Sequence, residues 1–69
     1  MKKSEIFATI KEANTIVDKM DKYVVGSLEY DEYNQALGWT LDSIIVEQAR
    51  LGFSLNLSKR TGHYWVKFF

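Results

Sequence analysis

The sequence predicts an α+β fold in which an antiparallel pair of helices is followed by a C-terminal β-hairpin. Three observations lead to this prediction. Apolar residues recur every three or four positions over residues 4–22 and again over residues 31–51, as they do along one face of an α-helix. From residue 53 apolar and polar residues alternate, which is typical of a half-buried strand. A glycine-containing turn then separates this strand, at about 53–58, from a second strand at about 63–68.

The 69 residues of the chain predict a single domain, residues 1–69. A domain this small buries only roughly 60% of the surface that its unfolded chain exposes, so its core is marginal on size alone. The sequence contains no cysteine and one histidine, which excludes disulfides and the common spacings of zinc ligands. We therefore expect the fold to depend on close packing or on association with a partner.

The first helix is predicted over about residues 4–22. Ser4 followed by Glu5 is a typical helix start, because a serine side chain can accept a hydrogen bond from a free amide of the first turn. The apolar stripe of this helix consists of Ile6, Ile10, Ala13, Val17 and Met20, with Phe7 and Ile16 beside it. The β-branched residues Val24 and Val25, followed by Gly26, favour an end to the helix.

The second helix is predicted over about residues 31–51, with Asp31 as its N-cap and Gly52 just beyond its C-terminus. Two alternatives remain at Gly38. The helix can continue through this glycine at a cost of about 1 kcal/mol relative to alanine, or it can break there, so that Thr40 caps a third helix over residues 41–51. We favour the continuous helix, because the apolar stripe keeps its phase across Gly38. This stripe contains Tyr33, Leu37, Leu41 and Ile44.

The hairpin turn is predicted at residues 59–62, where Gly62 can take the positive φ that the reversal requires. A turn of this length places Ser58 opposite His63. The register then pairs Phe53 with Phe68, Leu55 with Val66 and Leu57 with Tyr64 on one apolar face. Because apolar cross-strand pairs stabilise a sheet, we expect this register in place of one shifted by a residue.

The core is expected to form between this apolar face and the two helices. The helices should contribute Ile6, Ile10, Ala13, Val17, Met20, Leu37, Leu41, Ile44 and Ile45. The hairpin should contribute Phe53, Leu55, Leu57, Tyr64, Val66 and Phe68. The opposite face of the hairpin then carries Trp65 and Phe69 among polar residues, and the core does not account for them.

Charge is divided unevenly along the chain, although the formal net charge is zero. All nine acidic residues lie before residue 50, and residues 50–69 contain none. This acid-free segment includes the second face of the hairpin and its basic turn, so we take it as a candidate binding surface. The candidate partner-binding residues are Lys59, Arg60, His63, Trp65, Lys67 and Phe69.

The sequence predicts no catalytic, cofactor or metal site. A general acid or base needs a second group that orients or uses it, and His63 has no carboxylate within its own hairpin. Asp18 and Asp21 alternate with lysines, which is typical of a solvated helix surface. The acids of residues 29–32 lie at a predicted helix start, where they stabilise the helix dipole. We therefore predict that the protein is not an enzyme.

The sequence favours a small non-catalytic protein-binding or regulatory protein that acts through the second face of its hairpin. Tryptophan and arginine concentrate binding energy at protein interfaces, and an isolated two-stranded sheet is marginally stable. A second copy, a different protein or a helix of the same chain could each cover Trp65. An acidic helical surface is a second candidate, for a basic protein partner, and contains Glu29, Asp31, Glu32, Asp42 and Glu47. No small-molecule substrate is predicted.

The order of elements also resembles a winged helix-turn-helix protein over about Asp31 to Phe69, if a separate helix spans residues 41–51. In that family such a helix enters the major groove and the hairpin contacts the DNA backbone. The resemblance implies DNA binding as the alternative function. In this sequence the corresponding helix carries Asp42 and Glu47 with only Arg50 as a base. Because phosphates would repel most of that surface, we favour a protein partner.

No apolar run approaches the roughly 20 residues of a membrane span. Charged residues at positions 5, 11 and 12 interrupt any signal peptide after the basic start of the chain. We therefore expect a cytoplasmic protein that does not bind a membrane. The composition, with frequent lysine, isoleucine, asparagine and tyrosine, is typical of an AT-rich genome and suggests a low-GC bacterium, its phage or a mobile element as the source.

Overall fold

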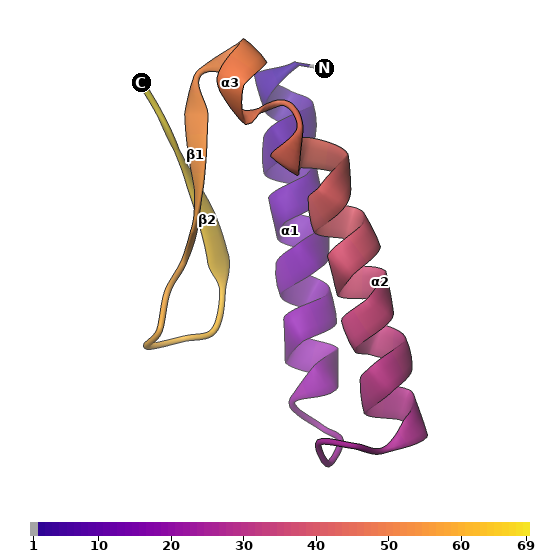
Figure 1. Cartoon of the computed structure of the whole chain (residues 1–69). Helices are drawn as coiled ribbons and strands as arrows, with labels where there is room; N and C mark the ends of the chain where they lie inside the picture. Colours follow the sequence, from indigo (N-terminus) through magenta and orange to yellow (C-terminus); the bar gives the residue numbers. More distant parts are fainter. Residues whose placement is uncertain (1) are drawn as a thin grey trace.

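The computed structural model describes residues 2–69, in which two long helices lie side by side and a β-hairpin packs along the first of them (Figure 1). The helices are α1, Lys3–Met20, and α2, Leu28–Ile45, with 18 residues each. A single helical turn, α3, Gln48–Leu51, leads to the strands β1, Phe53–Leu57, and β2, Tyr64–Phe68. This arrangement confirms the predicted α+β class.

The predicted register of the hairpin is confirmed. β1 and β2 are antiparallel, and Phe53 pairs with Phe68 at one end while Leu57 pairs with Tyr64 at the other. The pairing extends beyond the strands, because the amide of Phe69 donates to the carbonyl of Gly52 over 2.9 Å. Gly62 has the expected positive φ, 75°, in the turn.

The start of each long helix differs from the prediction. α1 begins at Lys3, one residue before Ser4, because the Glu5 carboxylate accepts a hydrogen bond from the Lys2 amide over 3.1 Å. α2 begins at Leu28, because the hydroxyl of Ser27 accepts a hydrogen bond from the amide of Tyr30 over 3.2 Å and takes the N-cap role expected of Asp31. Both caps satisfy amides that would otherwise lack partners in the first turn.

The helix ends differ as well. α1 ends at Met20, two residues before the predicted end. α2 is continuous through Gly38, so the alternative with a break there is wrong. The predicted end at residue 51 is also wrong, because α2 stops at Ile45 and α3 is a separate turn. The chain must change direction before β1 to bring Phe53 against Ile44, and a helix continued to residue 51 would carry β1 away from the core. Gly52, at φ 72°, ends α3 as a C-cap glycine.

The core contains eight buried apolar side chains in two clusters. Ile6, Ile10, Ile44 and Phe53 form one cluster, and Ala13, Met20, Leu37 and Leu41 form the other. All eight were predicted as core residues. Two other predictions are wrong: Ile45 is exposed because it is the last residue of α2, beyond Ile44 of the core, and Leu57 is exposed because β2, and not β1, lies next to α1 at the turn end of the hairpin. In the part of the chain described, no helix is long and apolar enough to cross a membrane.

Candidate functional site

The hairpin has one face against the helices and one face that the helices do not cover (Figure 1). We call the second one the outer face; its residues are Ser54, Asn56, Trp65, Lys67 and Phe69. They share this face because side chains alternate along a strand and Trp65 pairs with Asn56, and Lys67 with Ser54. Trp65 remains 48% exposed, and Lys67 and Phe69 are exposed beside it.

The polar side of the outer face is ordered by its own hydrogen bonds. The side-chain amide of Asn56 donates to the carbonyl oxygen of Ser54 over 3.2 Å and to the hydroxyl of Ser54 over 3.1 Å. These bonds hold Asn56 along β1, directly across from Trp65. The indole therefore lies beside a small polar surface that already has hydrogen-bond partners of its own.

Lys59 and Arg60 lie at the turn, at the end of the hairpin away from Phe69. Both side chains are exposed. The turn is closed by a hydrogen bond of 2.8 Å from the Gly62 amide to the Ser58 carbonyl. The predicted basic and aromatic residues therefore form an elongated surface, with two cations at the turn and Lys67 farther along β2 between the two exposed aromatic side chains.

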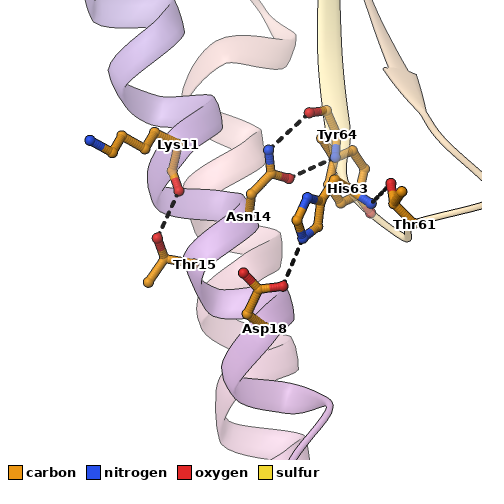
Figure 2. Close-up of polar contacts among 7 residues, drawn as sticks. All are labelled: Lys11, Asn14, Thr15, Asp18, Thr61, His63 and Tyr64. Carbon is orange, nitrogen blue, oxygen red and sulfur yellow. Dashed lines mark hydrogen bonds and ion pairs between the residues drawn. The ribbon is translucent and has the colours of Figure 1, made fainter.

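His63 lies apart from this surface. Its Nε2 atom is 2.7 Å from Oδ1 of Asp18 on α1, so its side chain points to the helix rather than standing beside Trp65 (Figure 2). His63 precedes the first ladder residue of β2, so the alternation of side chains does not fix its direction. The sequence predicted that His63 has no carboxylate within its own hairpin, and the carboxylate that it contacts belongs to α1.

Asn14, one helical turn before Asp18, makes a second contact that the sequence did not predict. Its Nδ2 donates to the carbonyl oxygen of Tyr64 over 3.0 Å, and its Oδ1 accepts from the amide of Tyr64 over 2.7 Å (Figure 2). Tyr64 occupies a position of the ladder where the amide and carbonyl point away from the partner strand. Asn14 therefore bonds to the free edge of β2 in the way a neighbouring strand would.

Gln48 of α3 bonds to the free edge of β1, on the opposite side of the hairpin. Its Oε1 accepts a hydrogen bond from the amide of Leu55, on the free edge of β1, over 3.0 Å. Unpaired strand edges invite association with other strands, and at these two places a side-chain amide occupies the edge. Both bonds also fix the hairpin relative to the helices, so the outer face is held on a rigid support.

The predicted acidic surface is present on α2, with one change. Asp31 and Asp42 are exposed there, as are Glu29 and Glu32. Glu47 is engaged elsewhere, because its Oε2 lies 2.8 Å from Nε of Arg50. The acidic surface therefore belongs to α2 alone and lies on the opposite side of α1 from the hairpin (Figure 1).

The described residues contain neither a metal site nor a pocket that could hold a ligand. Within residues 2–69, no group of three acids or histidines is arranged to hold a metal ion. The same residues enclose no pocket. The outer face exposes the indole of Trp65 and the phenyl ring of Phe69 to a ligand. The positive charge of Lys67 lies between them, and those of Lys59 and Arg60 lie at the turn.

Comparison with known proteins gives no match: no family model, no curated protein and no solved structure corresponds to this chain.

Proposed function

We propose that this is a non-catalytic protein-binding protein, with a regulatory role, whose binding surface is the outer face of the hairpin. The observation that carries the proposal is the position of Trp65. This large side chain stays 48% exposed on a strand whose other face is packed against the helices. Tryptophan is among the residues that contribute most to protein interfaces, because its large ring buries much area at a low cost in conformational entropy.

The charge of the hairpin indicates which kind of protein surface would fit. Residues 50–69 contain no acid, and Lys67 stands between the two exposed aromatic side chains. A partner with carboxylates around an apolar pocket would match both the ring and the charge. The amide bonds from Asn14 and Gln48 support this role, since a surface that is ordered before binding loses less conformational entropy when a partner docks.

DNA binding receives less support. The winged-helix interpretation required a separate helix over residues 41–51, but residues 41–45 belong to α2 and α3 has four residues. Contact of the basic turn with DNA remains a prediction. Titration with mixed-sequence duplex DNA at low salt tests it, and binding at tens of micromolar or tighter would favour it.

The proposal is tested by capture from a bacterial lysate with three tagged proteins: wild type, Trp65→Ala and Trp39→Ala. Trp39→Ala is a matched control for the partner of the hairpin alone, because Trp39 is also an exposed tryptophan but lies on α2, away from the hairpin. We expect a protein that wild type and Trp39→Ala retain and that Trp65→Ala loses. The proposal is wrong if all three proteins retain the same set of captured proteins in equal amounts.

A second measurement separates a different protein from a second copy. The mass of wild type and of Trp65→Ala in solution is measured over a range of concentrations. A dimer that Trp65→Ala converts to monomer identifies the partner as another copy of the chain. A monomer in both cases leaves a different protein as the partner.

A further inference from the structure

The side of α2 that faces away from the core carries a second set of exposed apolar residues. Six residues at alternating steps of four and three form this side, of which three are large and apolar, and we call them the α2 outer stripe: Leu28, Glu32, Gln35, Trp39, Asp42 and the C-cap residue Val46. Leu28 is 71% exposed, Trp39 66% and Val46 77%. An ordinary surface helix has mostly polar residues on this side; here three large apolar side chains are interspersed with Glu32, Gln35 and Asp42, so the face opposite the core is part apolar and part acidic.

The solvent face of α1 lacks this feature and provides a comparison within the molecule. Its exposed residues are mostly charged or small and include both signs: Ser4, Ala8, Lys11, Glu12, Thr15 and Lys19. The one large apolar side chain exposed on α1, Phe7, lies against Phe68 of β2 with a centroid distance of 5.5 Å. The α2 outer stripe is therefore not a general property of the helices in this small fold.

The charge of α2 is entirely negative. The helix contains four acids and no lysine or arginine; the acids are Glu29, Asp31, Glu32 and Asp42. Over residues 2–69 the carboxylates that contact a basic or imidazole side chain are those of Glu47, with Arg50, and Asp18, with His63, so the carboxylates of α2 make no such contact. Two of these carboxylates, Glu32 and Asp42, lie in the α2 outer stripe itself, one on each side of Trp39.

This charge restricts what can cover the stripe. Pairing with α2 of a second copy would bring acids against acids, which opposes association. An anionic membrane surface would be repelled for the same reason. The hairpin of the same molecule cannot reach the stripe, because it lies on the other side of α1 (Figure 1). A positively charged partner remains.

We infer that the α2 outer stripe docks an amphipathic helix of another protein whose apolar side is flanked by lysine or arginine. Residues 28–46 span about 27 Å, or five helical turns, which suits a helix lying alongside α2. Trp39 is near the middle of this length, where interface energy concentrates. Glu32 lies about two helical turns before Trp39 and Asp42 about one turn after it. At these positions their carboxylates would meet cations at the edge of the contact.

This second surface goes beyond the proposed function of the hairpin and does not depend on it. The two surfaces lie on opposite sides of the molecule (Figure 1). They also have opposite charge, so within this chain only the hairpin of a second copy could meet the stripe, and the dependence of Trp39 emission on protein concentration tests for that pairing. A chain that uses both would hold a basic helix and a carboxylate-bearing protein at the same time.

The test uses the Trp65→Phe protein, in which Trp39 is the only tryptophan. The probe is a synthetic amphipathic helix of about 18 residues with leucine at heptad positions and lysine beside them. Its twin has glutamate in place of each lysine. We expect the lysine peptide to shift the emission of Trp39 to shorter wavelength, as the indole leaves water, and the glutamate peptide to cause no shift.

Charge-reversed variants in the same background locate the site. The double variant Glu32→Lys, Asp42→Lys should bind the lysine peptide about tenfold more weakly and should bind the glutamate peptide. Glu12→Lys with Asp21→Lys makes the same change in net charge on α1 and its C-cap, and should change the dissociation constant by less than about threefold. Gain of binding to the glutamate peptide also shows that the first variant is folded.

Three results would overturn the inference: no shift of Trp39 emission at about 100 micromolar lysine peptide, equal binding of both peptides, or equal weakening by both pairs of substitutions. A Trp39 emission that changes with protein concentration alone would assign the stripe to a second copy and also overturn it. Since Trp65 is absent from these proteins, each result is independent of whether the hairpin binds a partner.

Discussion

The two faces of the hairpin are formed by alternate residues of the same two strands and differ in what they contact. On the inner face, Phe53 is 2% exposed and packs against Ile6 and Ile44. On the outer face, Trp65 is 48% exposed although it is the larger side chain. The two core clusters contain residues of the inner face and none of the outer face. The aromatic residues of the outer face remain exposed, and in the proposed function a partner covers them.

The largest effect is expected on the inner face, from Phe53→Ala. This change removes a ring from the centre of a small core and leaves a cavity, which should lower the free energy of unfolding by about 3–5 kcal/mol. Urea unfolding followed by circular dichroism measures it. A loss below about 1 kcal/mol would mean that the inner face does not support the fold, and the comparison between the faces would fail.

The next effect is expected at Asn14, which joins the hairpin to α1. Asn14→Leu leaves the amide and carbonyl of Tyr64 without their partner, which should cost about 1–3 kcal/mol. Thr15→Ala is the control, because Thr15 lies on the exposed side of α1 and its hydroxyl bonds only to the Lys11 carbonyl in its own helix (Figure 2). Hydrogen exchange should show faster exchange at the Tyr64 amide in Asn14→Leu alone. Unchanged exchange there would contradict the role of Asn14 at the strand edge.

Two glycines should respond to alanine with opposite signs. Gly62→Ala places a side chain at φ 75° in the turn, which should cost about 1–2 kcal/mol from backbone strain. Its new Cβ would meet Val17 Cγ1 at 3.8 Å, an ordinary contact that adds no clash. Gly38→Ala, within continuous α2 and in open space, should stabilise the protein by up to about 1 kcal/mol. Thermal unfolding of the two variants measures both changes, and the same sign in both would refute the assigned conformations.

The smallest effect on stability is expected on the outer face. Trp65→Ser removes a side chain that is half buried and lies outside the two core clusters, so the free energy of unfolding should fall by about 1 kcal/mol or less. Urea unfolding of Trp65→Ser and Phe53→Ala under the same conditions compares the two losses in the free energy of unfolding. A loss approaching that of Phe53→Ala would show that Trp65 supports the fold, and the outer face would then not be free for a partner.

The pattern of apolar residues was sufficient to predict most of the fold. The register from Phe53–Phe68 to Leu57–Tyr64 follows from alternation, because a slip by one residue would expose the whole apolar set. The end of α2 did not follow from any local pattern. The apolar spacing continues to Leu51, and only the need to bring β1 back to Ile44 ends the helix at Ile45.

The candidate site was predicted in part. Alternation was enough to place Trp65, Lys67 and Phe69 on one face. It could not show that Asp18 contacts His63, since that contact joins residues 45 positions apart. One signal was available in the sequence: Asn14 and Asp18 are polar residues four apart at the border of the apolar stripe of α1, where a neighbouring element can reach them.

The most direct test of the central claim is oxidative footprinting of Trp65 in the free protein and in the complex captured through its hairpin. Trp39, on the other side of the molecule, is an internal reference in the same chain. We expect both tryptophans to be oxidised in the free protein and oxidation of Trp65 to fall several-fold in the complex. Equal oxidation of Trp65 with and without the partner would contradict the account, because the partner would then be bound elsewhere.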